Sequence, residues 1–403
     1  MQITLKSSNP AESLPQANTG RGPSRFSPSI PAAGRLALIL LASFAFSSCG
    51  SASQRATEAK QSFEIPAGYT VKLEFIKRIK TDAQPKQVCL HPERNEFYVA
   101  NLNNGGGANT KKLGPGTLQI FSLDTFELLH EEPARTAVEC LILDRDHLLY
   151  SDMFRDEVVY FDLATRKVLA RSPVKSDKVK NFSGTEYRYM PKIIEPLSDS
   201  EALVTLWLDG MSTIDFKQGK LIRHYDKFCA LPRGILRVPG KEEVYIMCYG
   251  IPQGPGEIVH LDLKTGKVLN RLRTGGSPRH VITRPDGKAL ISNLNSGEIY
   301  LFDPATGSIL HRLYLGGGIN TVDSDPSGRF LFISQRELDL VSVIDTSNWK
   351  VVLKEKVGDY PTGLDVSYDG KYMAVTNFHE ADMDLYRIHY VPSEQPPEQN
   401  SQE

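Results

Sequence analysis

The feature that most constrains this chain is a pattern that recurs seven times between residues 85 and 391. Each copy contains short runs rich in Val, Ile, Leu, Tyr and Phe, separated by turn pairs such as Asp286-Gly287 and Thr306-Gly307. Because glycine supplies the positive φ that tight hairpins need, most copies are expected to form four antiparallel strands. The copies begin near Pro85, Thr136, Pro191, Pro232, Pro278, Ile319 and Pro361.

Four strands in about 40–45 residues are typical of one propeller blade. The last copy lacks a fourth strand, and a strand-like segment, Tyr69–Ile79, precedes the first copy. We therefore predict an all-β fold, a seven-bladed β-propeller over residues 69–391, in which Tyr69–Ile79 completes the last blade. Such closure leaves few unpaired strand edges. The alternative is an open solenoid, which would need capping repeats at both ends.

Several short motifs recur in the copies. They include Pro-x-x-Val/Leu starts, Asp-Gly-Lys turns at 286–288 and 369–371, and Ser/Thr-Asn runs that end at Asn293 and Asn377. These repeats resemble the YVTN-type seven-bladed β-propeller family. The resemblance implies the fold and leaves the activity open, since such folds carry many functions.

The N-terminus predicts an exported lipoprotein. Residues 1–48 resemble a secretory signal with a long leader, and the apolar run Leu36–Phe46 is shorter than the ~20 residues of a membrane span. The following Ser47-Ser48-Cys49 resembles a bacterial lipobox, which would make Cys49 the lipid attachment site, although Phe46 stands where Leu is commonest. Residues 49–68 are then the lipidated cysteine and a flexible tether, and residues 392–403 a disordered tail. The alternative is an ordinary cleaved signal.

The charge balance and the motifs of the chain exclude some classes of function. The chain has 47 basic and 48 acidic residues, which argues against bulk capture of nucleic acid. It carries no nucleotide-binding fingerprint or nucleophile motif, so no cofactor is predicted. The expected protein is a monomer of the bacterial cell envelope, held on the membrane by its lipid. Its partner would be an unknown protein or a small anionic ligand.

The remaining four cysteines follow the strand pattern. Cys89 and Cys140 are predicted to occupy equivalent positions on neighbouring blades. Such positions are usually too far apart for a disulfide, which needs Cα atoms within ~7 Å of each other. Two free buried thiols are therefore expected. Cys229 and Cys248 could form a bridge, but we favour the unbridged form. No zinc-type spacing occurs.

The acidic hairpin Glu380, Asp382 and Asp384 could gather a hard cation such as calcium. A solvated acidic hairpin is the favoured interpretation, so no metal is predicted.

The starts of the innermost strands should surround one mouth of the channel. They carry Lys86, Lys192, Arg233, Arg279 and His280, whose combined charge could attract a carboxylate, a phosphate or a single-stranded backbone. The somewhat favoured alternative is that each pairs with a nearby carboxylate or solvates the rim. The ends of the second strands are polar or aromatic in every copy and are expected to hydrogen-bond between blades: Asn101, Asp152, Trp207, Tyr249, Asn293, Gln335 and Asn377. Trp207 and Tyr249 are added to the candidate ligand-binding residues.

Three functions compete. The favoured one is a lipid-anchored binding or interaction scaffold without catalysis. The second is a hydrolase, because Pro278-Arg279-His280 is similar to a stretch of lactonase-type propellers and would make His280 an acid or base. Those families place Asn-Glu at the end of the next strand, whereas Leu294 follows Asn293 here. The third, a single-stranded nucleic-acid binder, is disfavoured by the charge balance.

Overall fold

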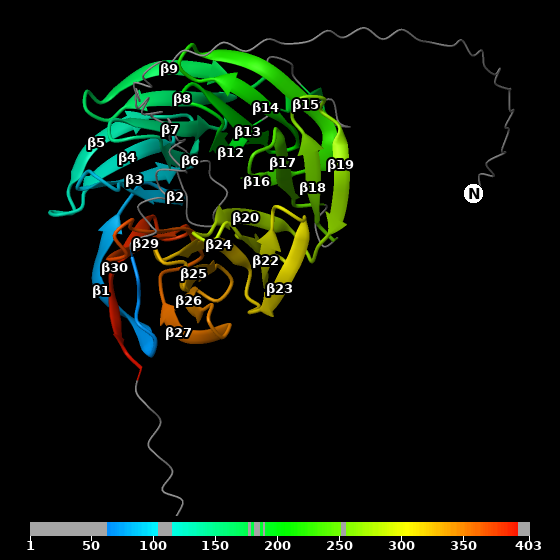
Figure 1. The fold of residues 1–403 in the computed structure, drawn as a ribbon. Helices are drawn as coiled ribbons and strands as arrows, with labels where there is room; N and C mark the ends of the chain where they lie inside the picture. Colours follow the sequence, from blue (N-terminus) through cyan, green and yellow to red (C-terminus); the bar gives the residue numbers. More distant parts are fainter. Residues whose placement is uncertain are drawn as a thin grey trace, which may run out of the picture. The chain divides into compact units, whose positions relative to one another are not determined.

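The computed structural model describes residues 63–103, 115–175, 179–180, 186–187, 190–250 and 255–393. It confirms the predicted all-β propeller, with seven four-stranded antiparallel sheets in a ring (Figure 1). Cys49, the N-terminal leader and residues 394–403 lie outside the described residues. The part of the chain that is described contains no helix with the length and hydropathy of a membrane span.

Blades 1 to 4 follow one another along the chain. Blade 1 holds β2 (Pro85–Leu90), β3 (Glu96–Asn101), β4 (Thr117–Ser122) and β5 (Leu128–Pro133). Blade 2 holds β6 (Ala137–Ile142), β7 (His147–Asp152), β8 (Glu157–Asp162) and β9 (Lys167–Pro173). Blade 3 holds β12 (Pro191–Pro196), β13 (Glu201–Leu206), β14 (Asp209–Asp215) and β15 (Lys220–Ala230). Blade 4 holds β16 (Pro232–Arg237), β17 (Glu243–Cys248), β18 (Glu257–Asp262) and β19 (Val268–Arg273).

Blades 5 to 7 complete the ring. Blade 5 holds β20 (Pro278–Thr283), β21 (Ala289–Asn293), β22 (Glu298–Asp303) and β23 (Ser308–Tyr314). Blade 6 holds β24 (Ile319–Ser324), β25 (Phe330–Gln335), β26 (Leu340–Asp345) and β27 (Lys350–Lys356). Blade 7 holds β28 (Pro361–Val366), β29 (Tyr372–Asn377), β30 (Asp382–Pro392) and the early strand β1 (Tyr69–Lys80). A short hairpin, β10 (Val179–Lys180) and β11 (Glu186–Tyr187), lies between blades 2 and 3 in the sequence.

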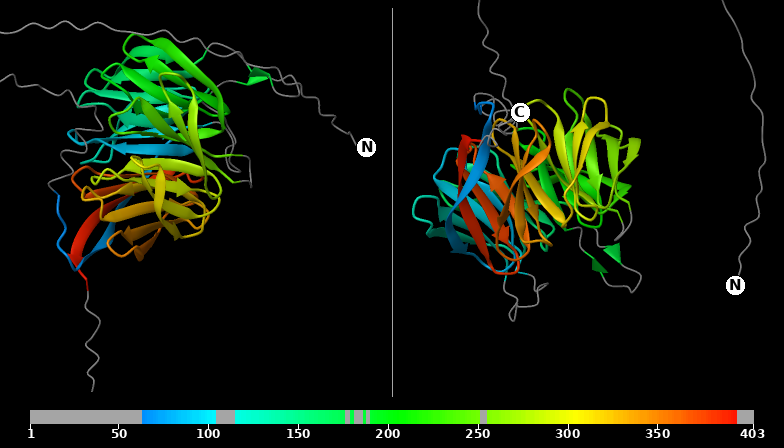
Figure 2. Two further views of the ribbon diagram at one scale, coloured as in Figure 1. Left: turned by 45° about the vertical axis from the view of Figure 1, so that its right-hand side comes forward. Right: turned by 90° about the horizontal axis from the view of Figure 1, so that it is seen from below.

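The early strand closes the ring as predicted. β1 pairs with β30 from Tyr69 opposite Pro392 to Lys80 opposite Asp382, and Figure 2 shows the two strands side by side. Arg78 donates two hydrogen bonds to Asp384 across this seam, at 2.6 and 2.9 Å. Just before β1, Phe63 packs on Tyr390, so the described end of the predicted tether lies against the propeller.

The apolar core lies between neighbouring blades rather than inside one of them. Each of the seven blade interfaces has its own buried cluster. Between blades 6 and 7, for example, Phe330 and Phe332 pack with Leu364 and Val375. Full burial of such a side chain contributes about 1.5–3 kcal/mol, so stacking of the blades holds the inner strands in place.

The prediction of free thiols at Cys89 and Cys140 is wrong, since the two form a disulfide with 6.4 Å between their Cα atoms. Strand register explains the error. Val88 pairs with Val99 and Cys140 pairs with Tyr150, so the equivalent of Cys140 is Val88, one residue before Cys89. Because successive residues of a strand point to opposite faces, this offset turns the two thiols toward each other across the interface of blades 1 and 2.

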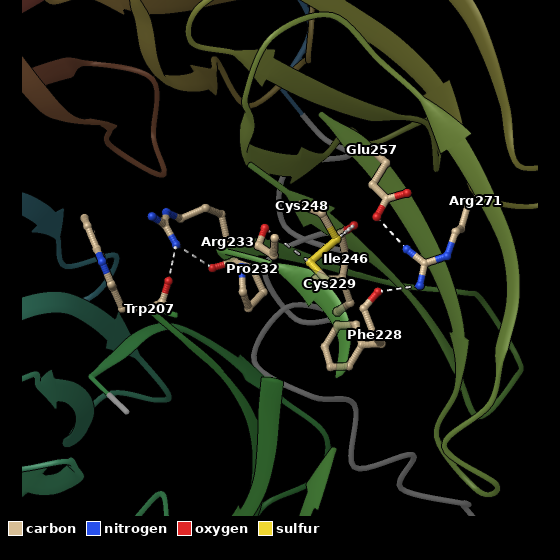
Figure 3. The surroundings of a disulfide bond; sticks show 10 residues. Trp207, Phe228, Cys229, Pro232, Arg233, Ile246, Cys248, Glu257 and Arg271 are labelled. Carbon is tan, nitrogen blue, oxygen red and sulfur yellow. Dashed lines mark hydrogen bonds and ion pairs between the residues drawn. A yellow bond between two sulfur atoms is a disulfide. The ribbon is translucent and has the colours of Figure 1, made fainter. Parts of the chain in front are cut away.

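Cys229 and Cys248 also form a disulfide, against the favoured expectation, with 5.6 Å between their Cα atoms. Cys229 lies near the end of the outer strand β15, and Cys248 pairs with Pro232 at the start of the inner strand β16. The bond therefore clamps the connection from blade 3 to blade 4 (Figure 3). Two disulfides are typical of an exported protein that folds in an oxidising compartment.

Candidate functional site

Every innermost strand begins with a break in its pairing register. The breaks lie between Pro85 and Gln87, Ala137 and Cys140, Pro191 and Ile194, Pro232 and Ile235, Pro278 and Val281, Ile319 and Val322, and Pro361 and Leu364. A β-bulge changes the direction in which side chains point. The second residues of four of these strands, Lys86, Lys192, Arg233 and Arg279, thereby come to line one axial cavity.

Hydroxyl groups hold the bulges in place. In five blades a Ser or Thr of the second strand accepts the backbone N–H that the bulge frees: Ser151 from Glu139, Thr205 from Ile193, Ser292 from His280, Ser334 from Thr321, and Thr376 from Gly363. Three of these hydroxyls also donate to a carbonyl of the next blade, at Lys192, Asn320 and Thr362. In blades 2, 5 and 6 the same hydroxyl thus ties the start of the inner strand both to its own blade and to the next one.

The cavity lies on the propeller axis and gathers residues from six blades. Besides the four cations, it is lined by Gln87, Val138, Glu139, Ile193, His280, Asn320 and Thr321. The empty volume of the cavity, open solvent included, is about 430 Å³. The structure therefore brings together five of the sequence-predicted residues, namely Lys86, Lys192, Arg233, Arg279 and His280.

The two predicted aromatic residues flank the cations. The Nζ of Lys192 lies 4.0 Å from the ring centre of Trp207, and the guanidinium carbon of Arg233 lies 4.3 Å from it. Arg233 is also 5.2 Å from the ring of Tyr249. Its Nη1 donates to the carbonyls of Pro232 and Trp207, at 2.8 and 3.3 Å (Figure 3). These contacts fix the Arg233 side chain against the wall of the cavity without neutralising its charge.

The cations have few negative partners. Among the described residues, no carboxylate forms an ion pair with Lys86, Lys192, Arg233 or Arg279, and Glu139 is the one acidic residue among the cavity-lining residues. Arg233 is only 4% exposed and Lys192 5%. Burial of like charges at this density costs free energy unless something balances it.

Burial and mutual repulsion shift the pKa values of these groups. Burial lowers the pKa of Lys86 and of Lys192 well below the ordinary range, and neighbouring arginines add to the effect. Burial likewise lowers the pKa of Arg233 to about 9 and that of Arg279 to about 10. Burial raises the pKa of Glu139 to about 8, against the opposing pull of Lys86 and Arg279. The site thus favours negative charge from outside.

His280, the candidate acid or base, is held as a neutral ring. Burial lowers its pKa to about 4, and its Nδ1 lies 3.1 Å from the carbonyl oxygen of Val322. At the end of the next strand, Asn293 donates to the backbone carbonyl of Glu298, and the side chain of Leu294 is fully buried. The structure therefore places no carboxylate at the position that lactonase-type propellers use.

The register corrects the alignment of the second strands. Asn101 pairs with Pro85, whereas Leu206 pairs with Pro191 and Cys248 pairs with Pro232. Trp207 and Tyr249 therefore lie one residue beyond the position assigned to them, just past the ends of β13 and β17. Arg336, which the sequence reasoning missed, occupies this same outer position after Gln335. Its guanidinium carbon lies 5.1 Å from the ring of Tyr360.

The side chains at the observed ends of the second strands form hydrogen bonds within their own blade or with the segments that connect two blades. Asn101 donates to Thr117 and Gln119 of its own blade, and Asn377 donates to Asp382. Asp152 instead accepts the N–H groups of Arg135 and Thr136, which connect blades 1 and 2. Gln335 donates to the carbonyl of Gly316, between blades 5 and 6.

The acidic hairpin is engaged with cations of the chain itself. Asp384 binds Arg78 and Asp382 binds Lys80, across the β1–β30 seam. Glu380 lies 3.4 Å from Arg78. The described residues contain no group of three or more His, Cys, Asp or Glu side chains placed to hold a metal ion.

Comparisons with known proteins show similarity in sequence to one protein and similarity in fold to a solved structure. No family model matches the chain. The chain is 25% identical over 340 residues to Antigen Lp49 of Leptospira interrogans serogroup Icterohaemorrhagiae serovar copenhageni (strain Fiocruz L1-130), a match that covers 78% of this chain and 69% of that protein. A solved structure of Kuenenia stuttgartiensis hydrazine synthase is similar with a TM-score of 0.60 and 15% identity, over 77% of this chain and 97% of the other. The structural likeness is one of fold.

Proposed function

We propose that this protein is an exported, lipid-anchored β-propeller of the bacterial cell envelope that binds an anionic ligand at its axial cavity without transforming it. The observation that carries the proposal is the convergence of Lys86, Lys192, Arg233 and Arg279, from four different blades, on one cavity. Binding sites of this kind are concave and use a few convergent polar groups.

The proposed location rests on independent features. The apolar run before Cys49 and the lipobox-like sequence predict export and acylation, and the two disulfides fit an oxidising compartment. Similarity to a protein named an antigen fits a position where the chain meets molecules outside the cell. Acyl chains contribute about 0.8 kcal/mol per buried methylene, so they would hold the propeller on a membrane.

Binding rather than catalysis is favoured by the chemistry of the cavity. His280 is neutral and hydrogen-bonded to a backbone carbonyl, and the lining residues include no Ser, Cys or paired carboxylates. Acid–base catalysis needs a group whose pKa lies near the working pH, and the pKa of His280, at about 4, lies well below that range. Glu139, with a pKa of about 8, is mostly protonated near neutral pH and leaves the cationic groups of the cavity uncompensated.

Three experiments test the proposal. The intact mass of the protein from the membrane fraction is expected to correspond to a chain that begins at Cys49 and carries acyl groups, and Cys49→Ala is expected to abolish that species. For the binding role, lactone turnover by the wild-type protein that disappears in His280→Ala would favour the hydrolase. Salt-dependent binding of single-stranded DNA that Arg279→Gln abolishes would favour the nucleic-acid binder.

A further inference from the structure

We infer that the axial cavity selects a compact oxyanion with two or more negative charges, such as an inorganic tetrahedral oxyanion or a short dicarboxylate. This inference rests on the proposed function, because it names the class of ligand for the same site. It is drawn from the charge of the cavity, its unused hydrogen-bond donors, the directions from which the donors come, and the room available.

The charge balance sets the valence of the ligand. Four side chains that are cationic when protonated line the cavity, against the single carboxyl group of Glu139. A ligand with one negative charge would leave most of this repulsion in place. A doubly or triply charged ligand compensates it, and such compensation is worth more in a buried site than in water.

Unused donors point to an oxyanion. Within the described part of the chain, the Nε–H of Arg233 has no hydrogen-bond partner, and this residue is only 4% exposed. The Nε–H of Arg336, whose charge acts on Lys86, is likewise buried and without a partner among the described residues. A buried donor without a partner costs free energy, which oxygen acceptors that reach it can recover. Guanidinium groups match carboxylate and phosphate oxygens in geometry.

The arrangement of the donors sets the shape of the ligand. Lys86 comes from blade 1, Lys192 from blade 3, Arg233 from blade 4 and Arg279 from blade 5, so positive groups surround the axis from several directions. A single carboxylate directs its two oxygens to one side. A tetrahedral oxyanion, or a dicarboxylate with a short linker, presents oxygens in opposite directions and can contact more than one blade at once.

The volume of the cavity limits the size of the ligand. Only about 30 Å³ of the cavity can be reached by the centres of water molecules, which corresponds to two or three waters. A ligand that displaces these waters is a few heavy atoms across at its charged end. A polymer backbone or a bulky nucleotide base would have to stay outside the cavity.

The test is calorimetric titration of the full-length protein, purified from membranes in detergent, with sulfate, malonate, acetate and chloride at matched ionic strength. Sulfate and malonate represent the inorganic and the dicarboxylate source. We expect at least one of them to bind about tenfold or more tightly than acetate, since a dianion makes at least one additional hydrogen bond with a charged group. Arg279→Gln and Lys86→Gln are each expected to weaken this binding about tenfold.

Arg312→Gln is the matched control. Arg312 also lies over an aromatic ring, 4.8 Å from Tyr300, but on the outer strand β23. It should leave affinity unchanged. If acetate binds as tightly as the dianions, the inference on valence fails and the proposed anion site stands. If no anion binds, or if Arg279→Gln and Lys86→Gln both fold and bind like the wild type, both proposals fail.

Discussion

The guanidinium of Arg233 lies over the indole ring of Trp207, with 4.3 Å between the guanidinium carbon and the ring centre. Lys192 uses the same ring at 4.0 Å. Cation–π contacts of this kind contribute about 0.5–2 kcal/mol each when they are partly desolvated. Trp207 therefore stabilises two of the cavity's four cations and lies next to any anion that they bind.

This contact predicts a fluorescence signal. The chain has two tryptophans, Trp207 and Trp349. The ring of Trp349 lies 4.3 Å from that of His311 on the outer strand β23, and neither residue lines the cavity. Binding of a dianion should change the emission of Trp207, because the positions of Arg233 and Lys192 over its ring change. We expect the signal to persist in Trp349→Phe and to vanish in Trp207→Phe. A signal that follows Trp349 instead would place the anion elsewhere.

The closing seam predicts a stability effect. Asp384 is fully buried and accepts two hydrogen bonds from Arg78 and one from the N–H of Gly358. Arg78→Met leaves this carboxylate without its cation, which should destabilise the protein by about 2–4 kcal/mol. Urea unfolding measures the change. The exposed pair Lys371–Asp369 provides the control, since Lys371→Met should cost less than about 1 kcal/mol. Equal effects would show that the seam pair contributes no more than a surface pair.

The disulfide beside the site predicts a redox effect on both stability and binding. Cys229 and Cys248 are 19 residues apart in the sequence, and closing a loop of this length contributes about 3 kcal/mol. Cys229→Ala combined with Cys248→Ala should lower the free energy of unfolding by about that amount. It should also weaken anion binding several-fold, because Cys248 pairs with Pro232, directly before Arg233. The corresponding double variant at Cys89 and Cys140 should also affect stability. It should weaken anion binding less, because Cys140 adjoins Glu139, which is not one of the four cationic residues, whereas Cys248 pairs with the residue before Arg233. Identical affinity losses in both double variants would contradict this.

The repeat pattern was sufficient to predict seven blades, the closing role of Tyr69–Ile79 and the convergence of Lys86, Lys192, Arg233 and Arg279. It was not sufficient for positions that depend on a single residue of register. Side chains alternate between faces along a strand, so an offset of one residue reverses what a side chain meets. Ala137, and not Thr136, is the counterpart of Pro85, because Ala137 pairs with Asp152 as Pro85 pairs with Asn101. The predicted equivalence of Cys89 and Cys140 is therefore one residue out of register. Leu206 and Cys248, and not Trp207 and Tyr249, end the second strands of blades 3 and 4, and the position after Gln335 holds Arg336.

The cavity predicts that affinity for an anion depends on pH. Sulfate is the suitable probe, because its own charge does not change between about pH 9 and pH 7. In the empty site Lys86 faces Arg279, Arg336, Arg233 and Glu139, and its pKa lies well below the ordinary value. Lys192 faces Arg233, Lys86, Arg279 and Glu139, with the same direction of shift. A bound anion favours the protonated form of each lysine, so binding takes up protons and the affinity for sulfate should rise as the pH falls.

Glu139 adds to this dependence with the same sign. Its pKa is raised to about 8, so the carboxylate that competes with the ligand gains a proton as the pH falls below that value. Glu139→Gln should therefore bind sulfate more tightly than the wild type at pH 9 and show a shallower rise in affinity toward pH 7. Calorimetry in two buffers with different heats of ionisation measures the proton uptake directly. Affinity that increases with pH in the wild type would show that neither the lysines nor Glu139 face the bound anion.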